Sequence, residues 1–372
     1  MADLPPDAQL YLRPTAFVDA PFGYDGQVQR LAGGLTWFSA LEVIARTGPH
    51  RIAQRLVPLD RLDELRGTLG PDQRTRFDRL WQRITSARPA LSLGPRTLRF
   101  EAPAVMGIVN VTPDSFSDGG RHLAAEAAAA AAVDMAAAGA AIVDVGGEST
   151  RPGSTTVWDE DEIGRIEPVL TRLASAGLLV SVDTRKAAVM RRALAVGAQI
   201  VNDVSALTFD DQALATVAAA GCPVVLMHHQ GDPQTMQKDP RYDDVLLDVF
   251  DWLEARIDAC VAGGIARERI IVDPGIGFGK TLRHNLELLN GLSLLHVLGC
   301  PVLLGASRKR FIGALSNEAP ADRRLGGSIA VALAALGQGV QLLRVHDVPE
   351  TVQAMRVWQG LRDAALTPSA TT

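Results

Sequence analysis

The chain has 372 residues, of which 47% are hydrophobic, so it is long enough for one large domain or for a barrel with an appended unit. Its formal net charge of −5 offers no basic surface for nucleic acid, which we do not expect as a partner. No run reaches the roughly 20 apolar residues that cross a bilayer, and three cysteines without CxxC spacing fit a reducing environment, so we expect a cytoplasmic protein with no membrane partner.

In chain order, the first predicted unit is a small α/β extension over residues 1–95 whose role the sequence does not assign. Two of the three tyrosines, two tryptophans and a polar segment of helical periodicity, Asp72–Ala87, give it enough apolar material for a small packed unit. It contains no recognisable catalytic constellation. We expect Gly94-Pro95 to be the joint with the next unit.

From residue 96 to residue 366, short apolar runs alternate with polar or glycine-rich patches, and most patches precede helical periodicity. Eight runs are predicted strands: Ala104–Val109, Ala141–Val145, Leu178–Val182, Gln199–Val201, Val224–Met227, Ile270–Val272, Val302–Leu304 and Leu342–Val345. Because strand, loop and helix recur eight times and the runs are continuously apolar, the pattern predicts a (β/α)8 TIM barrel. Its site should lie where the eight loops converge, at the carboxyl ends of the strands. Residues 367–372 are expected to fray.

The loops after the first two strands are long and polar. Residues 110–120 include Asn110 and Phe116, and residues 146–153 combine glycines with Ser149, Thr150 and Arg151. Hydroxyl, backbone and guanidinium donors gathered in this way suit an anion. Taken singly, each polar residue fits an ordinary turn or helix cap equally well.

Three later strands end directly in polar side chains. Asp183, Asn202 and Asp273 would present oxygens and one amide to a flat heterocycle with N–H edges in the mouth of the barrel. Helix capping accounts for any one of them, but accounts for all three less well. The segment from Asp273 to Thr281 fits neither a P-loop, because Pro274 stands where glycine is needed, nor a Rossmann loop.

The last two strands precede Ser307-Arg-Lys309 and Arg344-Val-His346. Loops seven and eight of a TIM barrel commonly bind phosphate, and alternation along an extended segment puts Arg344 and His346 on one side. These cations favour a diphosphate or leaving-group site over ordinary surface solvation. The adjacent pair His228-His229 lacks a third ligand at metal spacing and does not predict zinc.

Taken together, these motifs resemble those of the dihydropteroate synthases, a family of pterin-binding TIM barrels. The likeness rests on residues 107–120, 144–153, 181–184, 202–204, 273–279, 307–309 and 344–347. It implies a magnesium-dependent, homodimeric transferase of folate biosynthesis and a target of sulfonamides. Such an enzyme condenses two small molecules, hydroxymethyl-dihydropterin pyrophosphate and para-aminobenzoate, to dihydropteroate and pyrophosphate.

The resemblance also implies roles for single residues. Pterin would be bound by Asp183, Asn202, Met227, Asp273 and Lys309. Of these, Asp183, Asp273 and Lys309 would be catalytic. The diphosphate would be bound by Asn110, which also holds Mg²⁺, and by Thr150, Arg151, Arg344 and His346. Aminobenzoate would be bordered by Phe116, Pro152, Phe278 and Ser307. One departure is His229, which stands where the family usually has methionine.

Two alternatives remain open at this point. A pterin-dependent methyltransferase would share the polar strand ends but has no diphosphate to hold, so Arg344 and His346 argue against it. A non-catalytic pterin-binding paralogue draws its main support from the unassigned first 95 residues.

Overall fold

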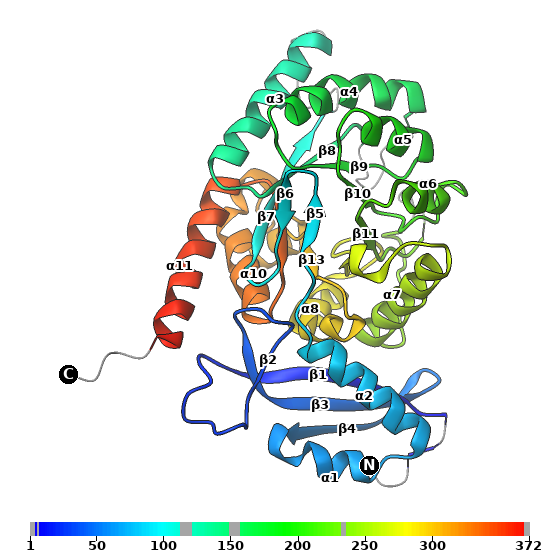
Figure 1. Ribbon diagram of the computed structural model, residues 1–372, viewed down its shortest axis with the longest axis vertical. Helices are drawn as coiled ribbons and strands as arrows, with labels where there is room; N and C mark the ends of the chain where they lie inside the picture. Colours follow the sequence, from blue (N-terminus) through cyan, green and yellow to red (C-terminus); the bar gives the residue numbers. More distant parts are fainter. Residues whose placement is uncertain (1–3, 6, 112–120, 149–156, 232–235, 368–372) are drawn as a thin grey trace, which may run out of the picture.

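The computed structural model of the chain describes residues 4–5, 7–111, 121–148, 157–231 and 236–367, with the side chains of residues 121–123 left aside. Phe116, Thr150, Arg151 and Pro152, all predicted site residues, lie outside this part. The described chain forms a barrel with an N-terminal unit below it (Figure 1). Among the described helices, none has both the length and the apolar character needed to cross a membrane.

Eight parallel strands form the barrel, in the order β12-β11-β10-β9-β8-β7-β14-β13. Their bounds are β7 Ala104–Asn110, β8 Ile142–Gly146, β9 Val180–Asp183, β10 Ile200–Asp203, β11 Val224–Met227, β12 Ile270–Asp273, β13 Leu303–Leu304 and β14 Leu342–Val345. A parallel bridge between Val272 and Val302 joins the two ends of this order. The predicted TIM barrel is therefore confirmed, and each predicted strand overlaps an observed one.

Helices surround the strands, as Figure 1 shows. The α-helices are α3 Arg121–Ala137, α4 Asp159–Ser175, α5 Ala187–Ala195, α6 Ala213–Ala220, α7 Val245–Ala262, α8 Leu282–Asn290, α9 Arg310–Leu315, α10 Leu325–Gly337 and α11 Val348–Leu366, and the 3-10 turns are η3 Arg267–Arg269, η4 Leu292–Leu298 and η5 Ala321–Arg323. Glycine in the left-handed region, such as Gly221 at φ 60°, ends α6 and turns the chain toward the next strand.

A hairpin of β5 (Leu91–Leu93) and β6 (Arg96–Leu98) covers the amino ends of the barrel strands. Its leucines form a separate buried cluster with residues of the strands, including Met106 and Ile142. Gly94, at φ 63°, lies in the turn of this hairpin. The dipeptide predicted as a joint therefore lies inside an element that packs on the barrel.

The N-terminal unit is an antiparallel sheet with helices. Its elements are β1 Gln9–Val18, β2 Gln29–Arg30, β3 Trp37–Thr47, β4 His50–Pro58, η1 Leu59–Arg61, α1 Leu62–Gly67 and α2 Pro71–Thr85. Strand β3 is central and pairs with β1, β2 and β4. Helix α2, which the periodicity of residues 72–87 predicts, packs on β1 and on η4 of the barrel. The sheet of this unit was not predicted strand by strand.

Candidate active site

Four barrel strands bring two carboxylates, an amide and a guanidinium into one hydrogen-bonded group toward their carboxyl ends. Arg344 donates from Nε to Asp144 Oδ2 at 2.7 Å and from Nη2 to Asp183 Oδ2 at 2.6 Å. Asn202 Nδ2 donates to the same Asp144 oxygen at 2.9 Å. Strand register places these residues side by side, since Asp183 pairs with Asn202 across β9 and β10. Asp183, Asn202 and Arg344 thus meet, as strand-end residues of a barrel should.

Asp144 is the member of this group that the sequence analysis did not single out. It is fully buried within β8, an otherwise apolar strand of sequence Ile-Val-Asp-Val-Gly. A carboxylate inside an apolar strand was the available signal, because a buried charge requires a partner. Here the partner is Arg344, about 200 residues later in the chain.

One oxygen of each carboxylate in the group has no hydrogen-bond partner in the described part of the chain. Asp183 Oδ1 and Asp144 Oδ1 are buried and accept no hydrogen bond from any described residue. Burial raises the pKa of Asp183 to about 7, with Arg344 opposing the rise and Asp144 adding to it. Unpartnered buried oxygens are costly, so these two are the natural acceptors for N–H groups of a ligand.

Asp273 ends β12, and Lys309 is the N-cap of α9 after β13; both lie next to this group. Asp273 Oδ1 accepts the backbone N–H of Gly275 at 2.7 Å. Lys309 Nζ donates to the carbonyl of Ile276 and lies 4.4 Å from the centroid of the Phe278 ring. Burial lowers the pKa of Lys309 to about 8, opposed by Asp273, and burial raises the pKa of Asp273. Lys309 can therefore change protonation near pH 8.

The loop after β12 packs directly on the loop after β11. A Cβ on Gly275, whose φ is +67°, would lie 1.8 Å from the His228 carbonyl oxygen, so only glycine fits there. Buried Lys280 joins the same loops, with Nζ 2.9 Å from His228 Nδ1, 3.4 Å from the His228 carbonyl oxygen and 3.0 Å from that of Phe278. Burial, with Lys309 nearby, lowers the pKa of Lys280 well below its usual value. Met227 is buried beside Gly275.

The loops after β13 and β14 hold the remaining predicted cation and hydroxyl. Ser307 Oγ accepts the backbone N–H of His346 at 3.2 Å and lies 3.1 Å from its Nδ1. Arg308 pairs with Asp347, which ties the two loops together. Arg344 and His346 therefore bind different partners: Arg344 faces the carboxylates, whereas His346 faces Ser307. The pairing of Arg344 with Asp183, a predicted pterin residue, and with Asp144 was not predicted from the sequence.

The second loop is anchored at both of its described ends. Lys186 Nζ lies 2.6 Å from Glu162 Oε2 and 3.2 Å from Glu148 Oε2, and it donates to the Val157 carbonyl at 2.5 Å. Arg185 also pairs with Glu148, at 3.2 Å. One buried lysine thus joins residues 148 and 157, between which Thr150, Arg151 and Pro152 lie outside the described residues.

Asn110, the predicted magnesium ligand, ends β7 and is half-buried beside Gly146. Within the described residues no three His, Cys, Asp or Glu side chains are grouped to hold a metal ion. A single amide oxygen still suits Mg²⁺, which keeps several waters and is usually bound by one or two protein oxygens together with substrate phosphates. The residues present therefore fit an ion that arrives with a diphosphate.

Buried carboxylates, an amide and a buried lysine at the mouth of a TIM barrel suit a flat heterocycle with N–H edges, as in an enzyme that binds a small molecule there. The family model described as "Pterin binding enzyme" matches residues 106–346. The dihydropteroate synthase of Escherichia coli K12 is 49% identical over 269 residues, which cover 72% of this chain and 95% of that one. That of Neisseria meningitidis serogroup B is 46% identical over 280 residues, covering 74% and 98%. The chain belongs to the dihydropteroate synthase family.

Solved structures agree with this assignment. The Xanthomonas albilineans dihydropteroate synthase with 4-aminobenzoic acid superimposes with a TM-score of 0.70 at 48% identity, covering 74% of this chain and 99% of that one. The same enzyme in complex with 7,8-dihydropteroate gives 0.67 at 46% identity, with the same coverage. The Yersinia pestis enzyme with a sulfonamide drug gives 0.70 at 46%, covering 74% and 100%. This chain is therefore longer than its relatives, and the family match begins only at Met106.

Proposed function

We propose that this chain joins hydroxymethyl-dihydropterin pyrophosphate to para-aminobenzoate, giving dihydropteroate and pyrophosphate. The observation that carries the proposal is the buried group of Asp144, Asp183, Asn202 and Arg344 with its unpartnered carboxylate oxygens. Family membership supports a synthase and gives no support to a methyltransferase or to a non-catalytic paralogue.

In this proposal the pterin lies among the buried carboxylates. Asp183 Oδ1, which has no donor among the described residues, accepts a ring N–H, and the second oxygen of Asp273 accepts another. Asn202 and Lys309 supply the complementary donors, and Met227 packs against a face of the ring. Carboxylates that face N–H edges gain charge-assisted bonds, which strengthen as positive charge develops on the pterin.

The diphosphate of the substrate would lie beside the same carboxylates, next to Arg344. Arg344 uses two of its five N–H donors on carboxylates, so donors remain for a phosphate oxygen. His346, Thr150 and Arg151 complete the anion site, and Asn110 would hold Mg²⁺. When bound, that ion neutralises charge on the diphosphate.

Aminobenzoate then occupies the space bordered by Phe116, Pro152, Phe278 and Ser307. The bond from the pterin methylene to the diphosphate oxygen breaks, the neutral aniline nitrogen forms the new C–N bond, and its proton is lost to water. No covalent intermediate on the protein is needed. Asp183 and Asp273 stabilise the electron-poor methylene between the two events. Sulfonamides, which resemble aminobenzoate, should compete for this space, and we expect the enzyme to act as a cytoplasmic homodimer.

The test is pyrophosphate release by purified protein with pterin diphosphate and Mg²⁺, with and without para-aminobenzoate, and with dihydropteroate measured by mass. Release that depends on aminobenzoate and disappears in Lys309→Ala supports the proposal. Arg66→Ala is the matched control, because Arg66 pairs with Asp78 on the exposed side of the N-terminal unit. Pterin binding without turnover would overturn the proposal and favour a non-catalytic pterin-binding paralogue.

A further inference from the structure

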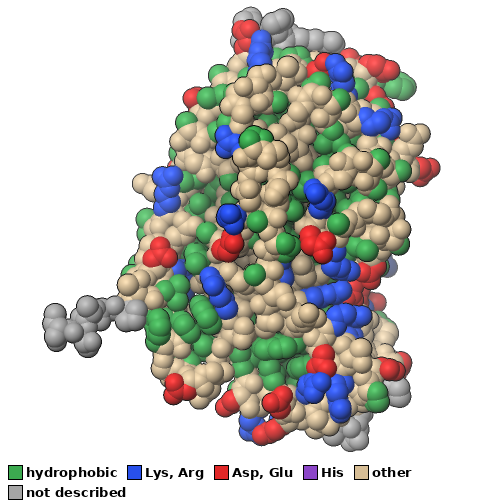
Figure 2. All heavy atoms as spheres, viewed as in Figure 1, with side chains coloured by type: hydrophobic (Ala, Val, Ile, Leu, Met, Phe, Trp, Pro, Cys, Tyr) green, Lys and Arg blue, Asp and Glu red, His purple; other side chains and the backbone are tan. Residues whose placement is uncertain are grey.

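An acidic stripe on α7 faces the N-terminal unit. Asp244, Asp248, Asp251 and Glu254 are spaced by four, three and three residues, so they lie on one face of the helix and its first turn. Asp244 is the N-cap of α7 and accepts the backbone N–H of Leu247. All four carboxylates are paired with residues of the N-terminal unit, and Figure 2 shows such charges side by side on the right, where the unit meets the barrel.

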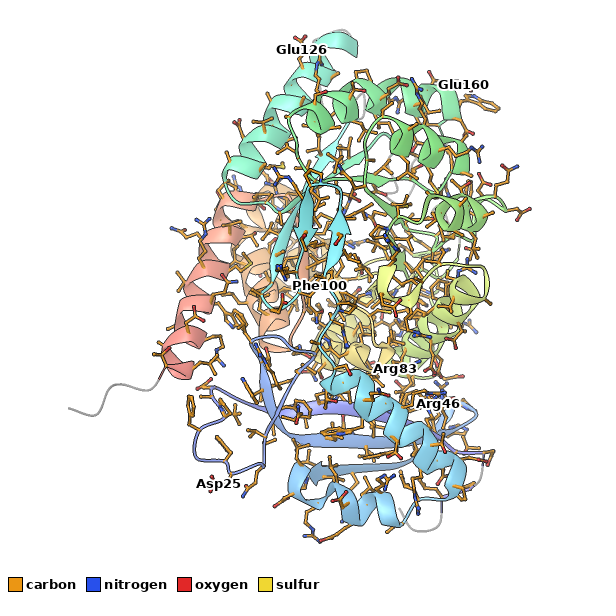
Figure 3. All side chains as sticks on the ribbon, viewed as in Figure 1. Asp25, Arg46, Arg83, Phe100, Glu126 and Glu160 are labelled. Carbon is orange, nitrogen blue, oxygen red and sulfur yellow. The ribbon has the colours of Figure 1, made fainter. Side chains whose placement is uncertain are left out.

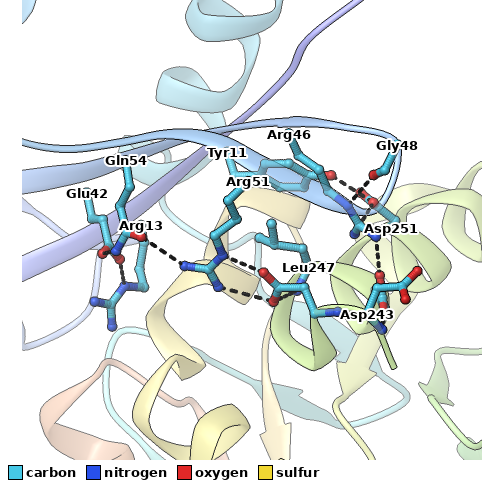
Figure 4. A network of polar contacts seen from close by, with 12 residues as sticks. Tyr11, Arg13, Glu42, Arg46, Gly48, Arg51, Gln54, Asp243, Leu247 and Asp251 are labelled. Atoms are coloured by element: carbon cyan, nitrogen blue, oxygen red, sulfur yellow. Dashed lines mark hydrogen bonds and ion pairs between the residues drawn. The ribbon is translucent and has the colours of Figure 1, made fainter. Parts of the chain in front are cut away.

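The N-terminal unit supplies the matching cations. Arg51 pairs with Asp244, and Arg46 lies 2.6 Å from Asp248 Oδ1 and 3.5 Å from Asp251 Oδ2 (Figure 4). Further contacts come from two sheet residues and two helix residues: Gln9 and Tyr11 donate to Asp251 at 2.8 and 2.7 Å, and Arg76 and Arg83 lie 3.1 Å from Glu254. Figure 3 shows Arg46 and Arg83 on the side of the unit that faces the barrel helices.

The stripe is connected to the loops of the pterin site. Asp248, held by Arg46 through Oδ1, accepts the backbone N–H groups of Asp243 and Asp244 through Oδ2 at 3.0 and 3.1 Å. The preceding residue, Tyr242, donates its hydroxyl to the Gly279 carbonyl at 2.8 Å. Residues 242–244, which precede α7, are thereby joined to the loop after β12 that carries Phe278.

A second connection runs through side-chain packing. Trp252 of α7 contacts the rings of His228 and His229 edge to face, with centroids 5.0 and 6.3 Å away. His228 in turn lies against Lys280, which holds the loop after β12. A shift of α7 would therefore move both loops that flank Met227.

We propose that the N-terminal unit is a brace on α7 which positions the loops after β11 and β12, and so sets the affinity of the pterin subsite. The proposal rests on the function proposed above. It gives a role to the part of the chain that precedes the family match at Met106. A brace acts through position, so the residues that make it touch no substrate.

The test compares full-length variants of the brace with a control in the same unit. Arg46→Ala removes the contacts to two carboxylates of the stripe, whereas Arg66→Ala removes the same kind of side chain from an exposed ion pair within the unit. Tyr11→Phe removes one hydroxyl and keeps the ring packed on Phe250, so it is a second variant should Arg46→Ala fold poorly. Binding of 7,8-dihydropteroate is measured by calorimetry.

Arg46→Ala should weaken dihydropteroate binding by about threefold to tenfold, as coupled positions commonly do. The KM for pterin diphosphate should rise while kcat stays unchanged. Tyr11→Phe should weaken dihydropteroate binding and raise the KM as well, but by less. Hydrogen exchange without ligand should be faster in residues 227–231 and 241–244 of both variants. Arg66→Ala should match the wild type in all three measurements.

Lower thermal stability with unchanged affinity and unchanged exchange in those segments would show a purely structural unit and overturn the brace. Failure of the wild type itself to bind dihydropteroate would instead overturn the proposed function. The two failures are distinct, because exchange reports the mechanical coupling in the absence of any ligand.

Discussion

Replacing Arg344 with glutamine separates two roles that its position allows, contact with the diphosphate and control of the Asp183 charge. Burial raises the pKa of Asp183 to about 7 even with Arg344 bonded to it. The ionised carboxylate is the form that accepts a pterin N–H, so kcat/KM of the wild type should rise with pH through about 7. It should fall above about 8, where Lys309, whose pKa burial lowers to about 8, loses its proton.

The size of the effect follows from the contact. With roughly 4 Å between charge centres and an effective dielectric constant of about 20, the ion pair is worth about 4 kcal/mol. That energy corresponds to a proton affinity of Asp183 about a thousandfold higher once the guanidinium is gone. At pH 8 about nine-tenths of the wild-type carboxylate is ionised, against about one-hundredth in the variant. The expected loss in kcat/KM at pH 8 is therefore about a hundredfold, before any lost diphosphate contact.

The assay is a pH profile of kcat/KM for pterin diphosphate between pH 5.5 and 9.5. In Arg344→Gln the acidic limb should move to higher pH, out of the range in which the wild type reaches its maximum. His346→Gln is the control, because His346 contacts Ser307, whereas the guanidinium of Arg344 contacts Asp183 itself. A variant that loses rate at all pH values but keeps its acidic limb near 7 would refute the electrostatic reasoning and leave Arg344 as a diphosphate ligand alone.

Three further predictions concern the loops and the metal. Gly275→Ala should destabilise the fold by about 3 kcal/mol or more in urea unfolding, because the new Cβ would lie 1.8 Å from the His228 carbonyl oxygen. Gly164→Ala is the control: this glycine lies in α4 with open space around it, so the change should be neutral or stabilising. Lys280→Met should cost about 2–4 kcal/mol by leaving three acceptors without a donor, and an unchanged urea midpoint would contradict that account. Chelation of Mg²⁺ should abolish turnover without lowering the melting temperature, and Asn110→Ala should need more Mg²⁺ for half-maximal rate; a falling melting temperature would instead indicate a structural metal.

The barrel could be predicted because buried parallel strands leave a simple pattern in the sequence. Val224–Met227 and Leu342–Val345 were predicted to the residue, since few structures besides a buried strand produce a short, continuous apolar run between polar patches. The N-terminal sheet gave no comparable signal. Strand β4 is exposed along most of its length, and β3 is buried along most of its length, so neither shows a clean alternation of apolar and polar residues.

The same physical reason accounts for which residues at the mouth of the barrel could be predicted from the sequence. Asp183 and Asp273 stand where apolar runs stop, and a strand end in a barrel has a defined place. Asp144 lies within its strand, where alternation and burial describe only a core position. What joins it to the buried polar group is Arg344, whose guanidinium reaches it from β14 at the other end of the barrel sequence. Side chains of distant strands come into contact only when the barrel closes. The sequence predicts that it closes, but not which side chains then become partners.

The acidic stripe on α7 is visible in the sequence, but by itself it does not predict an interface. Four carboxylates at helical spacing usually form a solvated face, and that interpretation is correct for most surface helices. Here the counterpart is an arginine-rich unit more than 150 residues earlier in the chain, as in the pairs of Arg46 with Asp248 and Arg83 with Glu254. An acidic face on a barrel helix together with unassigned arginines in an appended unit therefore fits docking, because the attraction between the two sets of charges offsets the cost of removing each from water. The rule predicts that neutralising the stripe, as in Asp248→Asn with Asp251→Asn, loosens the N-terminal unit while the barrel keeps its fold. Limited proteolysis of the full chain should then cleave between α2 and β5 sooner than in the wild type, and equal resistance would count against the ion pairs as the source of docking.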